Sequence, residues 1–132
     1  MMRYPIVIEE GSDTTAYGVV VPDLPGCFSA ADTLNEAIDA AKEAAAAWID
    51  AALDEGQAIP YASTLEEIRR LPEYAGWAVG VVELDDALSD DTIERVNITI
   101  PRRVLRRLDD IARSRGQSRG AFISDLTLSM RE

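Results

Sequence analysis

Three polar residues alternate with three aliphatic residues near the C-terminal end of the chain, over residues 95–100. Such alternation predicts a β-strand with one polar and one apolar face. Arginine can bond guanine through two hydrogen bonds, asparagine can do the same with adenine, and threonine can contact a thymine methyl group. The polar face, Arg95, Asn97 and Thr99, is therefore a candidate surface for reading DNA bases, with an ordinary solvated strand face as the alternative.

Two helices are expected after this strand. Pro101 suits the start of a helix, and an apolar stripe follows it at helical spacing. Gly116 is expected to end that helix, and Ser118 to cap a second one. The free backbone amides near Gln117 and Ser118 would suit a phosphate group.

Four arginines lie on the first of these helices, outside its apolar stripe: Arg102, Arg103, Arg106 and Arg107. They could contact the DNA backbone, and a solvated charged helix face is the competing interpretation. Spacing alone does not separate the two interpretations.

The charge of the chain changes sign just before this segment. Residues 1–94 hold 20 acidic and 4 basic side chains, and residues 95–132 hold 9 arginines and 4 acidic side chains. The net charge of −11 therefore hides an acidic part of −16 and a basic part of +5. Such asymmetry predicts two modules with different partners, residues 1–84 and 95–132, joined by an acidic linker over 85–94.

The C-terminal module is too small to fold alone, because chains below ~40 residues usually need a metal, a disulfide or oligomerisation. The chain has one cysteine and no histidine, which leaves oligomerisation. We expect two copies to pair their strands into a ribbon above four helices, and such a ribbon fits the DNA major groove. The protein is therefore expected to be at least a homodimer.

The N-terminal module is predicted to be a small sheet covered on one face by one long helix, an α+β fold. Strands are expected over residues 4–9, 16–21, 27–30 and 77–84, with the first two antiparallel. The long helix should begin after the capping box of Thr33 and Glu36 and end at Gly56, with many alanines facing the sheet. A second capping box, Ser63 with Glu66, predicts a short helix before Pro72.

Several acidic side chains of this module could serve as the metal-binding carboxylates of a two-metal nuclease: Glu9, Glu10, Asp13, Glu36 and Asp39. Adjacent strand residues point to opposite faces, and the helical pair falls on the polar side, so solvated charge is the favoured interpretation. No catalytic, metal or cofactor site is therefore expected. Cys27 lacks an evident activating base and is expected to be a buried apolar or loop residue.

The chain has no apolar run long enough to span a membrane and no signal-peptide pattern. The single cysteine excludes a framework of disulfides within the chain. A cytoplasmic protein is the expectation.

The segment Arg-x-x-Ile-x-Ile-Pro, the amphipathic helix and Gly116-x-Ser118-Arg119 resemble the ribbon-helix-helix DNA-binding fold, over about residues 95–130. The resemblance implies that Arg95, Asn97 and Thr99 read bases. It also implies that the start of the second helix, around Ser118 and Arg119, clamps a phosphate.

The earlier part resembles the HicB antitoxin family, most specifically in residues 22–27 (PDLPGC). The resemblance implies a partial ribonuclease-H-like domain that binds a HicA toxin, a small basic protein that cleaves messenger RNA. It also implies an operon repressor that binds double-stranded operator DNA, as a dimer that N-terminal contacts could extend to a tetramer. A metal-dependent nuclease and a ligand-sensing repressor without a protein partner are the alternatives.

Overall fold

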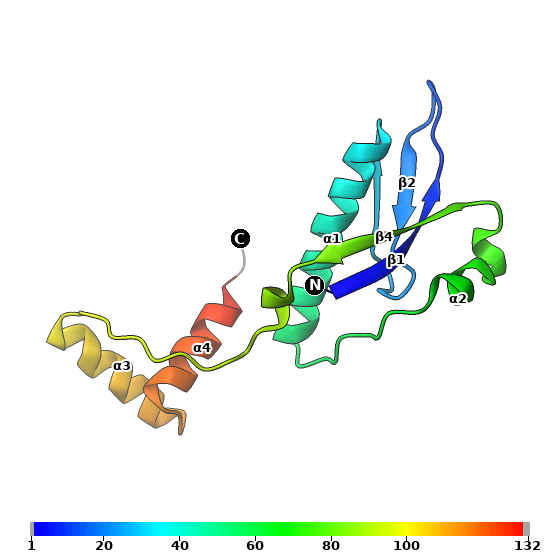
Figure 1. Cartoon of the computed structure of the whole chain (residues 1–132). Helices are drawn as coiled ribbons and strands as arrows, with labels where there is room; N and C mark the ends of the chain where they lie inside the picture. The colour runs from blue at the N-terminus through cyan, green and yellow to red at the C-terminus, as the bar shows by residue number, and fades with distance from the viewer. Residues whose placement is uncertain (1, 131–132) are drawn as a thin grey trace. The chain divides into compact units, whose positions relative to one another are not determined.

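In the computed structural model, which describes residues 2–130, the chain divides into two compact units between Asp91 and Thr92 (Figure 1). Each unit is described by itself below. The first unit contains a sheet and its covering helices, and the second contains two helices.

The first unit is built on a four-stranded antiparallel sheet. Its strands are β1 (Met2–Glu9), β2 (Tyr17–Val20), β3 (Phe28–Ala31) and β4 (Ala78–Leu84), in the order β3-β2-β1-β4. β1 pairs with both β2 and β4, so the longest strand lies inside the sheet. The predicted α+β fold and the antiparallel pairing of the first two strands are confirmed.

The long helix α1 (Leu34–Asp54) covers one face of this sheet (Figure 1). The Thr33 hydroxyl accepts a hydrogen bond from the Glu36 amide at 3.2 Å, as the capping pattern predicts. Gly56, at φ 73°, takes the left-handed conformation that ends the helix. Within the described residues, no helix combines the length and apolar composition that a membrane span requires.

The core lies between α1 and the sheet. Small side chains of α1 are fully buried there, and they let the helix backbone approach the strands closely: Ala37, Ala41 and Ala45. Ile49, farther along the helix, belongs to the same buried cluster as aliphatic side chains of the sheet such as Ile6 and Val19. The predicted alanine face is therefore the face that packs.

The second face of the sheet is partly covered by α2 (Leu65–Arg69) and the short 3-10 helix η1 (Pro72–Tyr74). The capping prediction for α2 was wrong by one residue. Thr64, not Ser63, caps the helix, and its hydroxyl accepts from the Glu67 amide at 3.2 Å. Ser63 is held elsewhere, because its amide and hydroxyl both donate to Asp23, at 2.8 and 2.6 Å.

The segment predicted as a linker, residues 85–94, is not a linker throughout. Asp86–Ser89 forms a second 3-10 helix, η2, with Leu88 packed against the core of the first unit. The Asp85 carboxylate accepts a hydrogen bond from the Ala87 amide at 3.0 Å and starts this helix. The first unit therefore extends beyond residue 84.

The second unit contains α3 (Arg102–Ser114) and α4 (Arg119–Ser129). Gly116, at φ 66°, ends the first helix, and the Ser118 hydroxyl accepts from the Ala121 amide at 3.2 Å to cap the second. Only Ala112 and Phe122 are buried among its described residues. Residues 92–101 form neither strand nor helix in the single chain, so the paired strand expected there stays a prediction.

Candidate functional site

The turn between β2 and β3, residues 22–27, is hydrogen-bonded to two other parts of the first unit, the loop before α2 and the helix α1. Asp23 receives both hydrogen bonds from Ser63, in the loop before α2. The Trp48 indole of α1 donates to the Pro25 carbonyl oxygen at 2.9 Å. The Tyr4 hydroxyl of β1 donates to the carbonyl of Pro60 at 2.7 Å, in the same loop as Ser63. The PDLPGC segment thus positions the α1–α2 loop.

Burial is the main reason that the pKa of the Tyr4 hydroxyl is raised, and the nearby Asp23 carboxylate raises it further. Burial likewise raises the pKa of the Cys27 thiol, which is 4% exposed. A neutral, buried thiol is a poor nucleophile, so Cys27 has the packing role that the sequence indicates. Neither group has the features of an activated catalytic residue.

Replacing Asp23 by alanine is expected to lower the free energy of unfolding by about 2–3 kcal/mol, because two partly buried donors of Ser63 lose a charged acceptor. Urea denaturation measures the change. Asp39→Ala is the matched control, since Asp39 is exposed on α1 and should shift stability by no more than about 0.5 kcal/mol. Equal stability of the two variants would mean that the loop is not held by Asp23.

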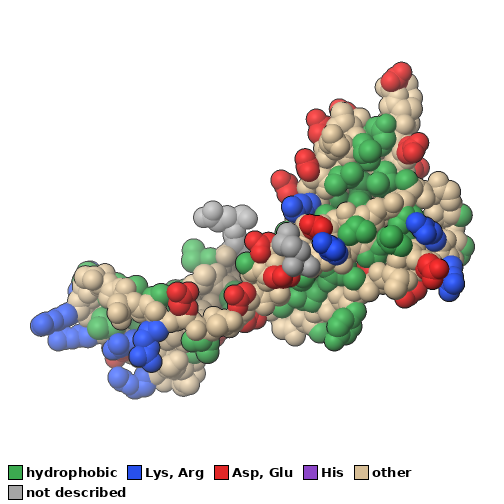
Figure 2. Space-filling view, in the orientation of Figure 1, with side chains coloured by type: hydrophobic (Ala, Val, Ile, Leu, Met, Phe, Trp, Pro, Cys, Tyr) green, Lys and Arg blue, Asp and Glu red, His purple; other side chains and the backbone are tan. Residues whose placement is uncertain are grey.

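A row of apolar residues crosses the sheet on the face opposite α1. Cross-strand pairing places Phe28 beside Val20, Val20 beside Val7, and Val7 beside Val79. Val7 is buried, whereas Phe28 at the edge is 69% exposed. Figure 2 shows hydrophobic side chains over the sheet of this unit. Exposed apolar surface of this kind is typical of protein interaction sites.

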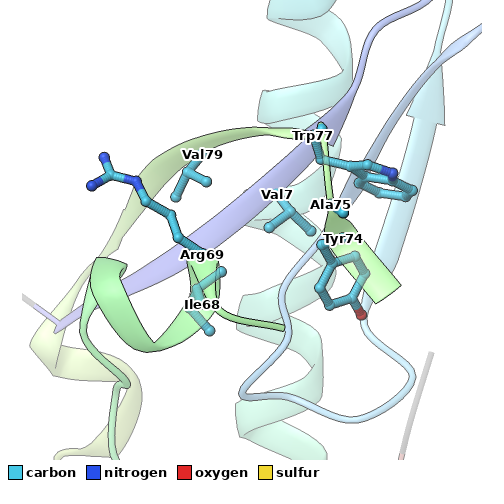
Figure 3. A pocket seen from close by; sticks show the side chains of 8 residues that line it. Val7, Ile68, Arg69, Tyr74, Ala75, Trp77 and Val79 are labelled. Carbon is cyan, nitrogen blue, oxygen red and sulfur yellow. The ribbon is translucent and has the colours of Figure 1, made fainter. Parts of the chain in front are cut away.

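A hollow of about 280 Å³ lies at the covered end of this row. Tyr74 and Trp77 form one side, with ring centroids 5.2 Å apart in an edge-to-face arrangement. Ile68 and Arg69 of α2 line the other side, and the Arg69 guanidinium points away from the aromatic pair (Figure 3). This hollow was missed by sequence reasoning, because it depends on how α2 lies on the strands.

The acidic side chains considered for a metal site are all exposed: Glu9, Glu10, Asp13, Glu36 and Asp39. Within residues 2–130, no three Asp, Glu, His or Cys side chains converge in a manner that could hold a metal ion. The residues present therefore do not fit a two-metal centre of the ribonuclease H type, which needs carboxylates gathered around the ions.

The predicted base-reading residues, Arg95, Asn97 and Thr99, are exposed on the extended segment before α3. The aliphatic residues between them are exposed as well, with Val96 at 73% and Ile98 at 66%. Both faces of this segment are therefore exposed, including the apolar face that a strand in a folded sheet would bury. The single chain does not complete this candidate site.

The three residues expected at a phosphate have partners within the second unit. The Ser118 hydroxyl caps α4, and the Gln117 side-chain amide donates to the Asp125 carboxylate. Arg119 makes two hydrogen bonds to Asp109, at 2.7 and 3.0 Å. Hydrogen bonding from Arg119 lowers the pKa of Asp109, and the same bond raises the pKa of Arg119. A phosphate would therefore meet the backbone amides at the start of α4 rather than a free Arg119.

Comparison with known proteins identifies relatives that match nearly the whole chain. The family described as "HicB_like antitoxin of bacterial toxin-antitoxin system" matches residues 4–127. An uncharacterized 14.9 kDa protein from the rep-hol intergenic region of Haemophilus phage HP1 is 39% identical over 127 residues, 95% of this chain and 94% of that protein.

Solved structures agree with the sequence relatives. The crystal structure of the Burkholderia pseudomallei antitoxin HicB is 36% identical, covers 97% of each chain and superposes with a TM-score of 0.62. A chain in a HicA3 and HicB3 toxin–antitoxin complex is 31% identical, with a TM-score of 0.53, and the match covers 64% of this chain and 99% of that one. The chain therefore belongs to the HicB-like antitoxin family of bacterial toxin–antitoxin systems.

Proposed function

We propose that this protein is the antitoxin of a HicAB-type pair, which binds and neutralises a small basic mRNA-cleaving toxin through its acidic first unit. The observation that carries the proposal is the match to the antitoxin HicB of Burkholderia pseudomallei over 97% of both chains. The match to the HicA3 and HicB3 complex supports the toxin partner, since it covers 64% of this chain, about the length of the first unit. The acidic charge of the first unit suits a cationic partner.

The apolar row on the open sheet face, with Phe28 at its exposed edge, is the surface proposed for the toxin. The opposite face is occupied by α1 and the far end of the row is covered by α2, so a partner can reach the end of the row that carries Phe28. To neutralise the toxin, this chain needs only to cover the toxin's RNA-binding surface. The antitoxin role therefore requires no catalysis by this chain, and a partial ribonuclease-H-like fold would serve as a binding scaffold.

Phe28→Asp is expected to weaken toxin binding at least tenfold, because a charged group would enter an apolar contact. Isothermal titration with the purified toxin measures the change. Tyr61→Asp is the matched control, since Tyr61 is 96% exposed and lies off the sheet, and it should bind like the unchanged protein. Equal affinity for both variants would move the toxin site away from this face.

The second unit is proposed to be a ribbon-helix-helix domain that represses the shared operon in the cytoplasm. Two chains would pair their residues 95–100 antiparallel, which would bury Val96 and Ile98 against the helices and present Arg95, Asn97 and Thr99 to DNA. Further exposed apolar side chains of α3 and α4 would be buried in the same dimer: Val104, Ile111, Ile123 and Leu126. A dimer is then the smallest working form, and contacts between first units could extend it to a tetramer.

A further inference from the structure

Four arginines form one exposed face along the first half of α3. They are Arg102, Arg103, Arg106 and Arg107. Together with Asp110 and Ile111 they line an open hollow of about 680 Å³. Figure 2 shows Lys and Arg side chains gathered on the unit that carries α3. We refer to the four residues as the arginine face.

The arginine face has no carboxylate partner within residues 2–130, and the three carboxylates on α3 and α4 bond to other side chains. Asp109 holds Arg119, and Asp110 lies 3.5 Å from Arg113. Asp125 accepts from the Gln117 side chain. The two helices of the unit therefore leave no carboxylate to pair with the four arginines, and the other described carboxylate of the unit, Glu94, is exposed in the segment before α3.

This arrangement costs stability in the isolated helix. Arg102 and Arg106, like Arg103 and Arg107, are like charges four residues apart, which repel each other on a helix surface. Positive charge in the first turn also opposes the helix dipole, and α3 has no acidic residue there. A polyanion bound to this face would remove both penalties.

Phosphate is the polyanion chemistry that fits best. The planar guanidinium group bonds phosphate oxygens in pairs, and every positive charge of the face is an arginine. The face begins at residue 102, directly after the segment of Arg95, Asn97 and Thr99 that is proposed to read bases. We propose that the arginine face binds backbone phosphates of double-stranded DNA flanking those bases, an inference that rests on the proposed repressor function.

The test uses the full-length protein and two DNA duplexes of equal length, one from immediately upstream of its own gene and one of mixed sequence. Dissociation constants are measured by fluorescence anisotropy over a range of NaCl concentrations. For Arg102→Gln with Arg106→Gln, we expect the slope of log affinity against log salt to flatten by up to about 3.6 in a dimer, at about 0.9 for each lost phosphate contact. Both duplexes should weaken by the same factor, because phosphates carry no sequence information.

Arg69→Gln with Arg70→Gln is the control, since it removes the same charge from exposed arginines of the first unit and should leave the slope unchanged. Thermal unfolding should show that the α3 variant is folded, because the substitutions relieve repulsion. A slope equal to that of the unchanged protein would overturn the inference. A loss of affinity confined to the upstream duplex would also overturn it, because the arginines would then read bases. Unchanged DNA binding with an altered oligomeric state would overturn it as well, because the arginines would then contact the acidic surface of a second copy. An unchanged protein that binds neither duplex would instead overturn the repressor function, and this inference with it.

Discussion

Replacing Arg95 by alanine is expected to weaken operator binding at least ~30-fold while toxin neutralisation stays intact. Each bidentate contact between a side chain and a base contributes about 1–3 kcal/mol, and a dimer loses two copies at once. The combined loss of about 2–6 kcal/mol corresponds to a dissociation constant at least ~30-fold weaker. Asn97→Ala should have a similar effect. Gel-shift titration with the upstream DNA measures binding, and growth of cells that co-express the toxin measures neutralisation.

Glu94→Ala is the control for this experiment, because Glu94 is an exposed neighbour with the wrong charge for DNA. It should bind the operator as well as the unchanged protein, or slightly better. Parallel loss of operator binding and neutralisation in the Arg95 variant would contradict the separation of the two functions between the two units.

A fragment of residues 1–91 is expected to fold alone, to bind the toxin and to lose operator binding altogether. The buried core cluster of this unit draws on β1, β2, β4 and α1, and Ala31 of β3 and Leu88 of η2 pack against it. The complementary fragment, 92–132, buries only two described side chains per chain and should fold only as a dimer. Its melting temperature should therefore rise with protein concentration. Circular dichroism and co-purification with the toxin measure these outcomes.

A shorter fragment, residues 1–84, provides the comparison. It lacks η2 and the Leu88 contact, and should be less stable than residues 1–91 by about 1–2 kcal/mol. Equal stability would show that η2 contributes nothing to the first unit. Failure of residues 1–91 to bind a toxin that the full chain binds would place the toxin site in the second unit.

The long helix could be predicted from sequence because its signals are local. Thr33 lies at its start, Gly56 follows its end, and the alanine face repeats between them. The strands were equally recoverable, within two residues, because their apolar runs are bounded by turn residues. In both cases neighbouring residues alone decide the structure.

The start of α2 was predicted at the wrong residue because two adjacent hydroxyl residues each precede a glutamate by three positions. Ser63 and Thr64 are equivalent as caps by pattern, and the choice is made by Asp23, which lies 40 residues away and binds Ser63. The same limit applies to Arg119. Its pairing with Asp109 joins two helices and leaves no trace in residue spacing.

The strand predicted at residues 95–100 shows a second limit of prediction, because its formation depends on another chain. Its alternation is clear in the sequence, yet a strand forms only where a second strand supplies hydrogen-bonding partners. Residues 92–101 of the single chain have no such neighbour strand, and Val96 and Ile98 stay exposed. The alternating pattern therefore predicts a strand that forms when two chains pair.

The most direct test of the antitoxin function is cleavage of messenger RNA by a purified HicA-type toxin, measured as this protein is added. If the chain is the antitoxin, cleavage should stop near one copy of this protein per toxin, and residues 1–91 alone should suffice. Cleavage that continues at full rate in a large molar excess of the full-length protein would contradict the antitoxin function.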